Sequence, residues 1–189
     1  MYHIKDEEYI KGKAPMTKEE IRAVSIAKLE IRDTDICLDI GGGTGTITME
    51  MARFARKGHI YTIEAKDNAY ELIQQNIKKF KLENITLIKG EAPEDLKSLG
   101  VEFDRIFIGG SGGNLEEIIQ YSYDNLKEKG ILVLNFIVLE NVFKTMEYLK
   151  KLDFTDTDIC QIIVSKNRKV KDFNMMMAEN PIYIITARK

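Results

Sequence analysis

A glycine-rich loop between a short apolar segment and a helical pattern constrains the fold of this chain more than any other stretch. Residues 37–45 read CLDIGGGTG, and a helical pattern begins at Thr46. A buried strand, a tight glycine turn and a helix N-terminus, in this order, are typical of an α/β sheet that binds a nucleotide-like ligand. Glycine permits positive φ angles and lets backbone approach a ligand, because it has no Cβ. Asp39 lies at the end of the strand, so we expect its carboxylate at the same crevice.

The rest of the chain alternates strand-like and helix-like segments joined by short turns, which predicts βαβ units. We predict an α/β fold, a doubly wound and mostly parallel Rossmann-like sheet of about seven strands, with an antiparallel strand near the C-terminus and helices on both faces. Thr17 is the predicted N-cap of the first helix, with Glu20 completing a capping box. The expected strands are 36–40, 58–64, 85–89, 103–108, 131–137, 159–164 and 182–187, and the expected helices are 17–29, 46–55, 69–80, 114 to about 126, and 141–150.

Length and composition are those of one soluble globular unit. At 189 residues, 44% of them hydrophobic, the chain can bury a sizeable core. We predict a single domain over 1–189, in which an N-terminal segment and helix (1–30) precede the core (31–189). The apolar run 131–139 is too short to span a bilayer, and 1–13 carries no secretion signal. Both cysteines lie in apolar segments, so we expect buried reduced thiols and a cytoplasmic protein.

Charge and histidine content exclude several kinds of site. A net charge of −2 argues against broad binding of nucleic acid. Two histidines, with no clustered cysteines, predict no metal site and disfavour a Ser-His-Asp triad.

The spacing of the glycines discriminates between nucleotide-like ligands. The dinucleotide fingerprint G-x-G-x-x-G is incomplete in either register, and no Lys-Ser/Thr pair follows Gly45 as a phosphate loop requires. The pattern acidic-x-G-x-G-x-G remains, and it resembles motif I of the class I S-adenosylmethionine (SAM) methyltransferases. SAM carries an ammonium and a sulfonium, which a carboxylate attracts. The resemblance implies that SAM binds at Asp39, Gly41, Gly42, Gly43, Thr44 and Gly45.

Two further strand ends extend this predicted cofactor site. Glu64 ends a strand 19 residues after Gly45, close to the ~20-residue offset at which an acid binds ribose hydroxyls. The next strand runs into Gly90-Glu91-Ala92-Pro93. By resemblance to the methyltransferases this loop lies beside adenine, so the Glu91 carboxylate and the Ala92 backbone are candidate contacts.

Several segments in the right order narrow the resemblance. The motifs are DEEYI at 6–10, PMTKEEIR at 15–22, GEAP at 90–93, GGSGG at 109–113 and MMM at 175–177 with Asn180-Pro181. Over essentially the whole chain, the sequence resembles the CbiT-type cobalt-precorrin methyltransferases of cobalamin biosynthesis. The resemblance implies that Thr17 contacts SAM, that the protein is a homotetramer, and that it methylates carbon 15 of a cobalt-precorrin with decarboxylation of the acetate arm at carbon 12. It assigns no acid or base, and the metal state of the substrate stays open.

A polycarboxylate substrate would need a local basic surface on this slightly acidic chain. Gly110, Ser111 and Gly112 offer backbone N–H groups to an anion, or form an ordinary flexible turn. The segment 166–171 contains Arg168 and Lys169 as candidate carboxylate ligands, and an exposed hairpin tip is an equally good interpretation of it. Lys13, Lys18 and Arg22 add basic side chains near the N-terminus. The run 175–177 is predicted to pack in the core, with a substrate or oligomer surface as alternatives.

Three other functions compete with this hypothesis. A SAM-dependent methyltransferase could act on RNA or on another small metabolite, although an RNA enzyme should carry a broader basic stripe. An NAD-dependent dehydrogenase is disfavoured by the incomplete glycine fingerprint. A non-catalytic SAM-binding regulator would share the same cofactor loop.

Overall fold

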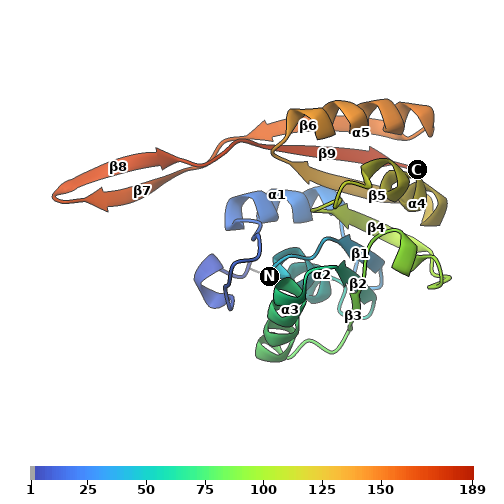
Figure 1. The fold of residues 1–189 in the computed structure, drawn as a ribbon, viewed down its shortest axis with the longest axis horizontal. Helices are drawn as coiled ribbons and strands as arrows, with labels where there is room; N and C mark the ends of the chain where they lie inside the picture. The colour runs from blue at the N-terminus through green and yellow to red at the C-terminus, as the bar shows by residue number, and fades with distance from the viewer. Residues whose placement is uncertain (1–2) are drawn as a thin grey trace.

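One seven-stranded sheet organises the protein, and a computed structural model describes residues 3–189 of it. The strand order is β3-β2-β1-β4-β5-β9-β6, with β1 to β5 parallel and β9 antiparallel between β5 and β6. This confirms the predicted α/β fold with an antiparallel strand near the C-terminus (Figure 1). The strands are β1 Ile36–Ile40, β2 His59–Glu64, β3 Ile85–Lys89, β4 Phe103–Ile108, β5 Leu126–Phe136, β6 Thr155–Ile162 and β9 Ile182–Arg188.

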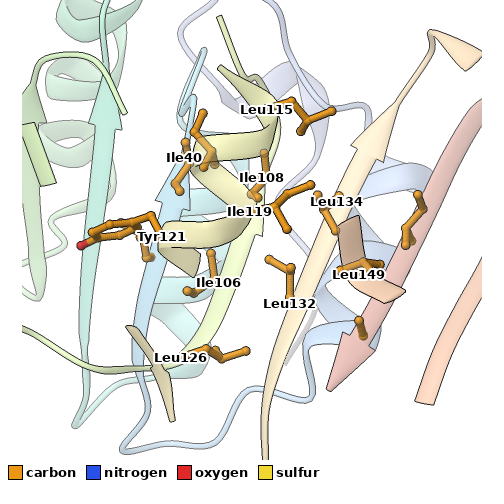
Figure 2. Close-up of a cluster of buried hydrophobic side chains, with 14 of the residues drawn as sticks. Ile40, Ile106, Ile108, Leu115, Ile119, Tyr121, Leu126, Leu132, Leu134 and Leu149 are labelled. Atoms are coloured by element: carbon orange, nitrogen blue, oxygen red, sulfur yellow. The ribbon is translucent and has the colours of Figure 1, made fainter. Parts of the chain in front are cut away.

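Helices cover both faces of the sheet because successive strand residues point to opposite sides. On β5, Leu132 and Leu134 pack with α4 and α5, as Figure 2 shows, whereas Ile131 and Val133 pack with α1 and α2. This two-sided burial explains why the central strands read as nearly continuous apolar runs. The helices are α1 Glu19–Leu29, α2 Thr46–Phe54, α3 Asp67–Phe80, α4 Leu115–Asn125 and α5 Leu139–Lys151, with 3₁₀ turns at Asp6–Glu8 and Glu94–Leu96.

The predicted capping box at the first helix is wrong. α1 begins at Glu19, and its N-cap is Lys18, whose side chain caps no backbone N–H among the residues described. The Thr17 carbonyl instead accepts hydrogen bonds from Arg22 Nη1 at 2.7 Å and Thr46 Oγ1 at 3.4 Å. Tertiary partners therefore hold Thr17 outside the helix, in a segment that local sequence preferences alone would let it cap.

The predicted strands did not include a second, two-stranded sheet, although an exposed hairpin tip was the alternative interpretation of 166–171. Strands β7 Ser165–Val170 and β8 Phe173–Ala178 form a hairpin that projects away from the main sheet (Figure 1). The expectation that 175–177 packs in the core is wrong, because Met175, Met176 and Met177 are 46%, 67% and 43% exposed and Phe173 is 73% exposed. An apolar run is buried only where the chain brings a second surface to it, and the hairpin reaches beyond the body that could supply one.

Three smaller findings complete the fold. Cys37 is buried on β1 as predicted, whereas Cys160 on β6 is only partly buried, because β6 lies at the edge of the sheet. Both thiols are free. Across residues 3–189, no helix is long and apolar enough to cross a membrane.

Candidate active site

A cavity of about 540 Å³ opens where the parallel strands end. The carboxyl ends of β1, β2, β3, β4 and β5 meet at one edge of the sheet, so the segments that follow them converge there. An N-terminal strap, residues 15–18, closes one side. The volume is that of a pocket for a small-molecule ligand. The lining includes 41–43, 64–66, 90–92, 109–112 and 135–137.

The glycine loop after β1 is clamped between two neighbouring segments. A Cβ on Gly43 would lie 2.7 Å from the Pro15 carbonyl oxygen, and one on Gly41 would lie 2.8 Å from the Gly110 backbone nitrogen. Both glycines have positive φ angles, +58° and +76°. The glycines therefore serve close approach within the protein as well as toward a ligand, because any side chain would push the strap or the β4 loop away.

Glu64 is fixed at the end of β2 by backbone hydrogen bonds. The side chain is 8% exposed and lines the cavity. Its Oε2 accepts the Gly43 N–H and its Oε1 accepts the Lys66 N–H, each at 2.9 Å. A carboxylate oxygen can accept more than one hydrogen bond, so this acid is preorganised and can still accept from ligand hydroxyls.

Asp39 presents a buried carboxylate with one oxygen unpaired. It is 1% exposed and lines the cavity, and Thr48 Oγ1 donates to its Oδ2. Its Oδ1 has no hydrogen-bond partner within residues 3–189. Burial raises the pKa of Asp39 to about 7, against the lowering effect of the Thr48 hydrogen bond. A buried, unpaired acid on a cavity wall is suited to a cationic ligand.

The N-terminal strap is tied to the body by buried polar groups. Arg22 of α1 donates to the carbonyl oxygen of Thr17 at 2.7 Å and to Asp6 Oδ1 at 3.0 Å, and its Nε lies 3.5 Å from Glu50 Oε1. Pro15 accepts the Thr44 N–H at 3.0 Å. Arg22 is fully buried, so its predicted place on a basic substrate surface is wrong. Its Nη1 and Nη2 groups instead tie Thr17 of the strap to Ile4 and Asp6 of the N-terminal segment.

Comparisons with known proteins identify the family. The sequence model of the precorrin methyltransferase domain matches residues 8–189, nearly the whole chain. The chain belongs to the precorrin methyltransferase family. A similar relative is a probable cobalt-precorrin-6B C(15)-methyltransferase (decarboxylating) of Saccharolobus solfataricus, 43% identical over 177 residues that make up 93% of this chain and 89% of the relative. A protein of the same name from Methanocaldococcus jannaschii is 40% identical, over 98% of both chains.

Solved structures agree with this assignment to the precorrin methyltransferases. The crystal structure of a precorrin-6Y C5,15-methyltransferase from Geobacter metallireducens superposes with a TM-score of 0.92 at 37% identity, covering 98% of this chain and 97% of that one. A precorrin 8W decarboxylase from Methanobacterium thermoautotrophicum gives 0.91 at 34% identity, covering 97% and 98%. The class I methyltransferase fold predicted from motif I is thereby confirmed.

SAM is the methyl donor of this methyltransferase, and the residues present fit it. The unpaired Oδ1 of Asp39 can face a cationic group, and the glycine loop leaves a surface without side chains. Of the predicted contacts, most line the cavity: Thr17, Asp39, Gly41, Gly42, Gly43, Glu64, Glu91, Ala92, Gly110, Ser111 and Gly112.

Four of the predicted site residues do not line the cavity of this precorrin methyltransferase. Thr44 donates its hydroxyl to the Pro15 carbonyl at 2.9 Å, and Gly45 is the N-cap of α2, so both lie behind the loop rather than on the cavity wall. Arg168 and Lys169 lie on β7 of the projecting hairpin and do not line this cavity, so their role in substrate binding stays a prediction.

Sequence reasoning missed several cavity residues. Asn135 was recognisable as the single polar residue in the apolar run 131–139, and Met16 and Asn180 lie in segments that carry the family resemblance, at 15–22 and 180–181. The other three residues lie in no recognised motif. The missed residues are Met16, Lys66, Asn114, Asn135, Glu179 and Asn180.

SAM affinity should rise with pH through about 7 because of Asp39. A bound cation favours the ionised carboxylate, whereas the free protein holds it half neutral near pH 7. Titration calorimetry with SAM at about pH 6 and 8 should show tighter binding at pH 8 and proton release at pH 6. The variant Asp39→Asn should abolish this dependence. If the SAM affinity of the wild type changed little or not at all between about pH 6 and 8, Asp39 would not be the residue that faces the cationic group.

The same raised pKa has a defined effect on folding stability. Since the folded-state pKa lies above the ordinary value of 3.8, protonation of Asp39 stabilises the fold. This contribution is complete below about pH 4 and is lost as the pH rises through about 7. In the Asp39→Asn variant, this part of the pH dependence of the free energy of unfolding should disappear.

Proposed function

We propose that this protein transfers a methyl group from SAM to carbon 15 of a cobalt-precorrin and releases carbon dioxide from the acetate arm at carbon 12. The curated relatives that carry this activity in their names match nearly the whole chain at about 40% identity. The observation that carries the proposal is the continuity of the cavity. One half of the cavity contains the acidic residues at the ends of β1 and β2, Asp39 and Glu64. The other half is lined by residues around the ends of β4, β5 and β9, and the two halves form one cavity.

The protein's own residues act by binding and orientation. Glu64 would accept hydrogen bonds from the ribose hydroxyls, Asp39 would face the cationic end of the donor, and the loop 41–43 would contact it through backbone without side chains. When bound, SAM supplies an electrophilic methyl group. Holding the ring carbon in line with that group can account for about 7–11 kcal/mol of the barrier.

The decarboxylation step needs little acid–base catalysis by side chains of the protein. The bond between the acetate methylene and its carboxylate breaks, carbon dioxide leaves, and the electron pair of that bond passes into the conjugated macrocycle. After carbon dioxide has left, the methylene takes one proton from solvent and becomes a methyl group. Apolar residues in this half, among them Phe107, Phe136 and Ile182, keep water from the substrate. The protein is therefore proposed to position the macrocycle and desolvate its acetate arm.

Mass spectrometry of the product tests the proposal. Given SAM and the cobalt-precorrin from the preceding pathway step, the product should gain one methyl and lose one carbon dioxide. Methyl gain alone would contradict the coupled decarboxylation. Methylation of RNA or another metabolite, with the cobalt-precorrin unchanged, would overturn the proposal in favour of another methyltransferase.

We also propose that the protein is a cytoplasmic homotetramer. Free thiols at Cys37 and Cys160 support a reducing compartment. The exposed apolar side chains of the hairpin, Val170, Phe173 and 175–177, support assembly, because a soluble monomer rarely exposes so many large apolar groups together.

Charged substitutions on the hairpin should break the tetramer. Phe173 and Met175 lie two residues apart on β8 and so share one face. Replacing both with glutamate would place charges in a desolvated interface, and light scattering after gel filtration should show smaller species. Lys78→Glu on the exposed side of α3 is the control and should leave the mass unchanged. A tetramer that survives the double substitution would exclude this face from the interface.

A further inference from the structure

Asn135 is a polar side chain at a strand position whose neighbours on the same face are apolar. It is the single polar residue in 131–139 and lies near the carboxyl end of β5. Residues two apart on a strand share a face, so Asn135 continues the row of Ile131 and Val133 toward α1. Its partner on β9, Ile184, belongs to the same apolar cluster. A leucine here would extend the core, so the amide needs another explanation.

The contacts of Asn135 show that no neighbouring residue depends on it for a hydrogen-bond partner. Its Nδ2 donates to Ser25 Oγ at 2.9 Å, and its Oδ1 lies 3.3 Å from the same hydroxyl, from which it can accept. Ser25 already donates its hydroxyl to the Ile21 carbonyl of its own helix at 2.8 Å. Removing the amide would leave Ser25 with a partner, so the pair is better understood as Ser25 orienting Asn135. Within the described chain the second N–H of the amide has no partner, and Asn135 lines the cavity.

Charge is distributed unevenly along the cavity. The half formed after β1, β2 and β3 contains the charged side chains Asp39, Glu64, Lys66 and Glu91. In the half around the ends of β4, β5 and β9, among residues 3–189, the charged side chain is Glu179, and the other polar side chains are neutral: Ser111, Asn114, Asn135 and Asn180. The N-terminal strap adds one further charged side chain to the lining, Lys18.

From this arrangement we propose that the Asn135 amide donates a hydrogen bond to the substrate carboxylate that is lost as carbon dioxide. The proposal rests on the proposed function. A leaving carboxylate loses its negative charge in the transition state, so a cation beside it would stabilise the ground state more and slow the step. A neutral amide orients the same group with a weaker ground-state interaction. Asn135 is thus a substrate-binding residue specific for the reacting arm.

Two substitutions at one position separate this role from a structural tie between α1 and β5. Asn135→Leu removes the donor at nearly constant volume, and kcat/KM for the cobalt-precorrin should fall by about 10- to 100-fold. Carbon dioxide released per methyl transferred should fall too. Asn135→Asp keeps an acceptor for the Ser25 hydroxyl but repels a carboxylate. It should therefore be worse than leucine for substrate, whereas a purely structural role predicts that it is better.

The measurements are steady-state kinetics, the ratio of carbon dioxide to methyl transfer, calorimetric affinity for S-adenosylhomocysteine and the thermal midpoint. The affinity should stay within about twofold of wild type, since Asn135 lies outside the β1–β3 half. Thr186→Val is the matched control. Thr186 lies on the same face, paired with Val133, its hydroxyl finds no partner in the described chain, and it does not line the cavity. It should show wild-type kinetics.

Each outcome decides the proposal. Wild-type kinetics and product ratio in both Asn135 variants would overturn it, as would equal losses of substrate use and S-adenosylhomocysteine affinity. If wild type and Thr186→Val bind S-adenosylhomocysteine but leave the cobalt-precorrin unchanged, the proposed function fails and the role of Asn135 fails with it. A normal wild type with a defect confined to the Asn135 variants supports both.

Discussion

Replacing Glu64 with alanine should weaken binding of S-adenosylhomocysteine by roughly 100-fold or more. Each hydrogen bond from a ribose hydroxyl to this buried carboxylate contributes about 1.5–3 kcal/mol. The substitution also removes the acceptors of the Gly43 and Lys66 N–H groups, which fix the glycine loop. Loss of two ligand contacts and of the loop anchor places this among the largest effects on binding. Titration calorimetry measures it directly.

Two variants calibrate the Glu64 result. Glu64→Gln keeps the shape of the side chain but has a single acceptor oxygen, so it should bind more tightly than alanine and less tightly than wild type. Glu94→Ala removes an acid from the nearby 3₁₀ turn that does not line the cavity, and its affinity should be unchanged. Wild-type affinity in Glu64→Ala, or tight binding of NADH by the wild type, would refute the assigned role.

Replacing Arg22 with leucine should lower the free energy of unfolding by about 3–5 kcal/mol, because it leaves buried charge uncompensated. Arg22 and Glu50 are fully buried, the Ile4 carbonyl would lose its donor, and the Thr17 carbonyl would keep only the longer of its two hydrogen bonds, from Thr46. Since Thr17 belongs to the N-terminal strap, affinity for S-adenosylhomocysteine should also fall. Urea denaturation at fixed protein concentration gives the stability change.

An exposed ion pair provides the comparison for Arg22. Lys151 lies 2.8 Å from Glu147 on α5, and both side chains are more than half exposed. Lys151→Ala should change stability by at most about 0.5 kcal/mol, because water screens such pairs. If Arg22→Leu were equally mild, the strap would be held by its other contacts, and Arg22 would not be the residue that organises it.

The cofactor half of the site could be predicted because its determinants are local. Asp39 and Glu64 lie at the carboxyl ends of apolar strands, and the loop 41–43 follows the first of them directly. Parallel strands bring their carboxyl ends to one edge whatever the loops between them do. The apolar alternation of strand and helix likewise predicted the sheet, since each element buries its own apolar side. Fold and family therefore followed from short segments read one at a time.

The rest depended on which distant surfaces meet. Thr17 and Thr44 have the residue types of a helix cap and a ligand contact, but their partners are Arg22 and Pro15, brought to them by tertiary packing. The same packing buries Arg22 with Glu50, leaves 175–177 exposed, and places Asn135 on the cavity wall. A sequence pattern states what a residue prefers within its own helix or strand. Whether its side chain ends in the core, in the cavity or in solvent depends on surfaces far away in the chain, and only the tertiary structure decided those.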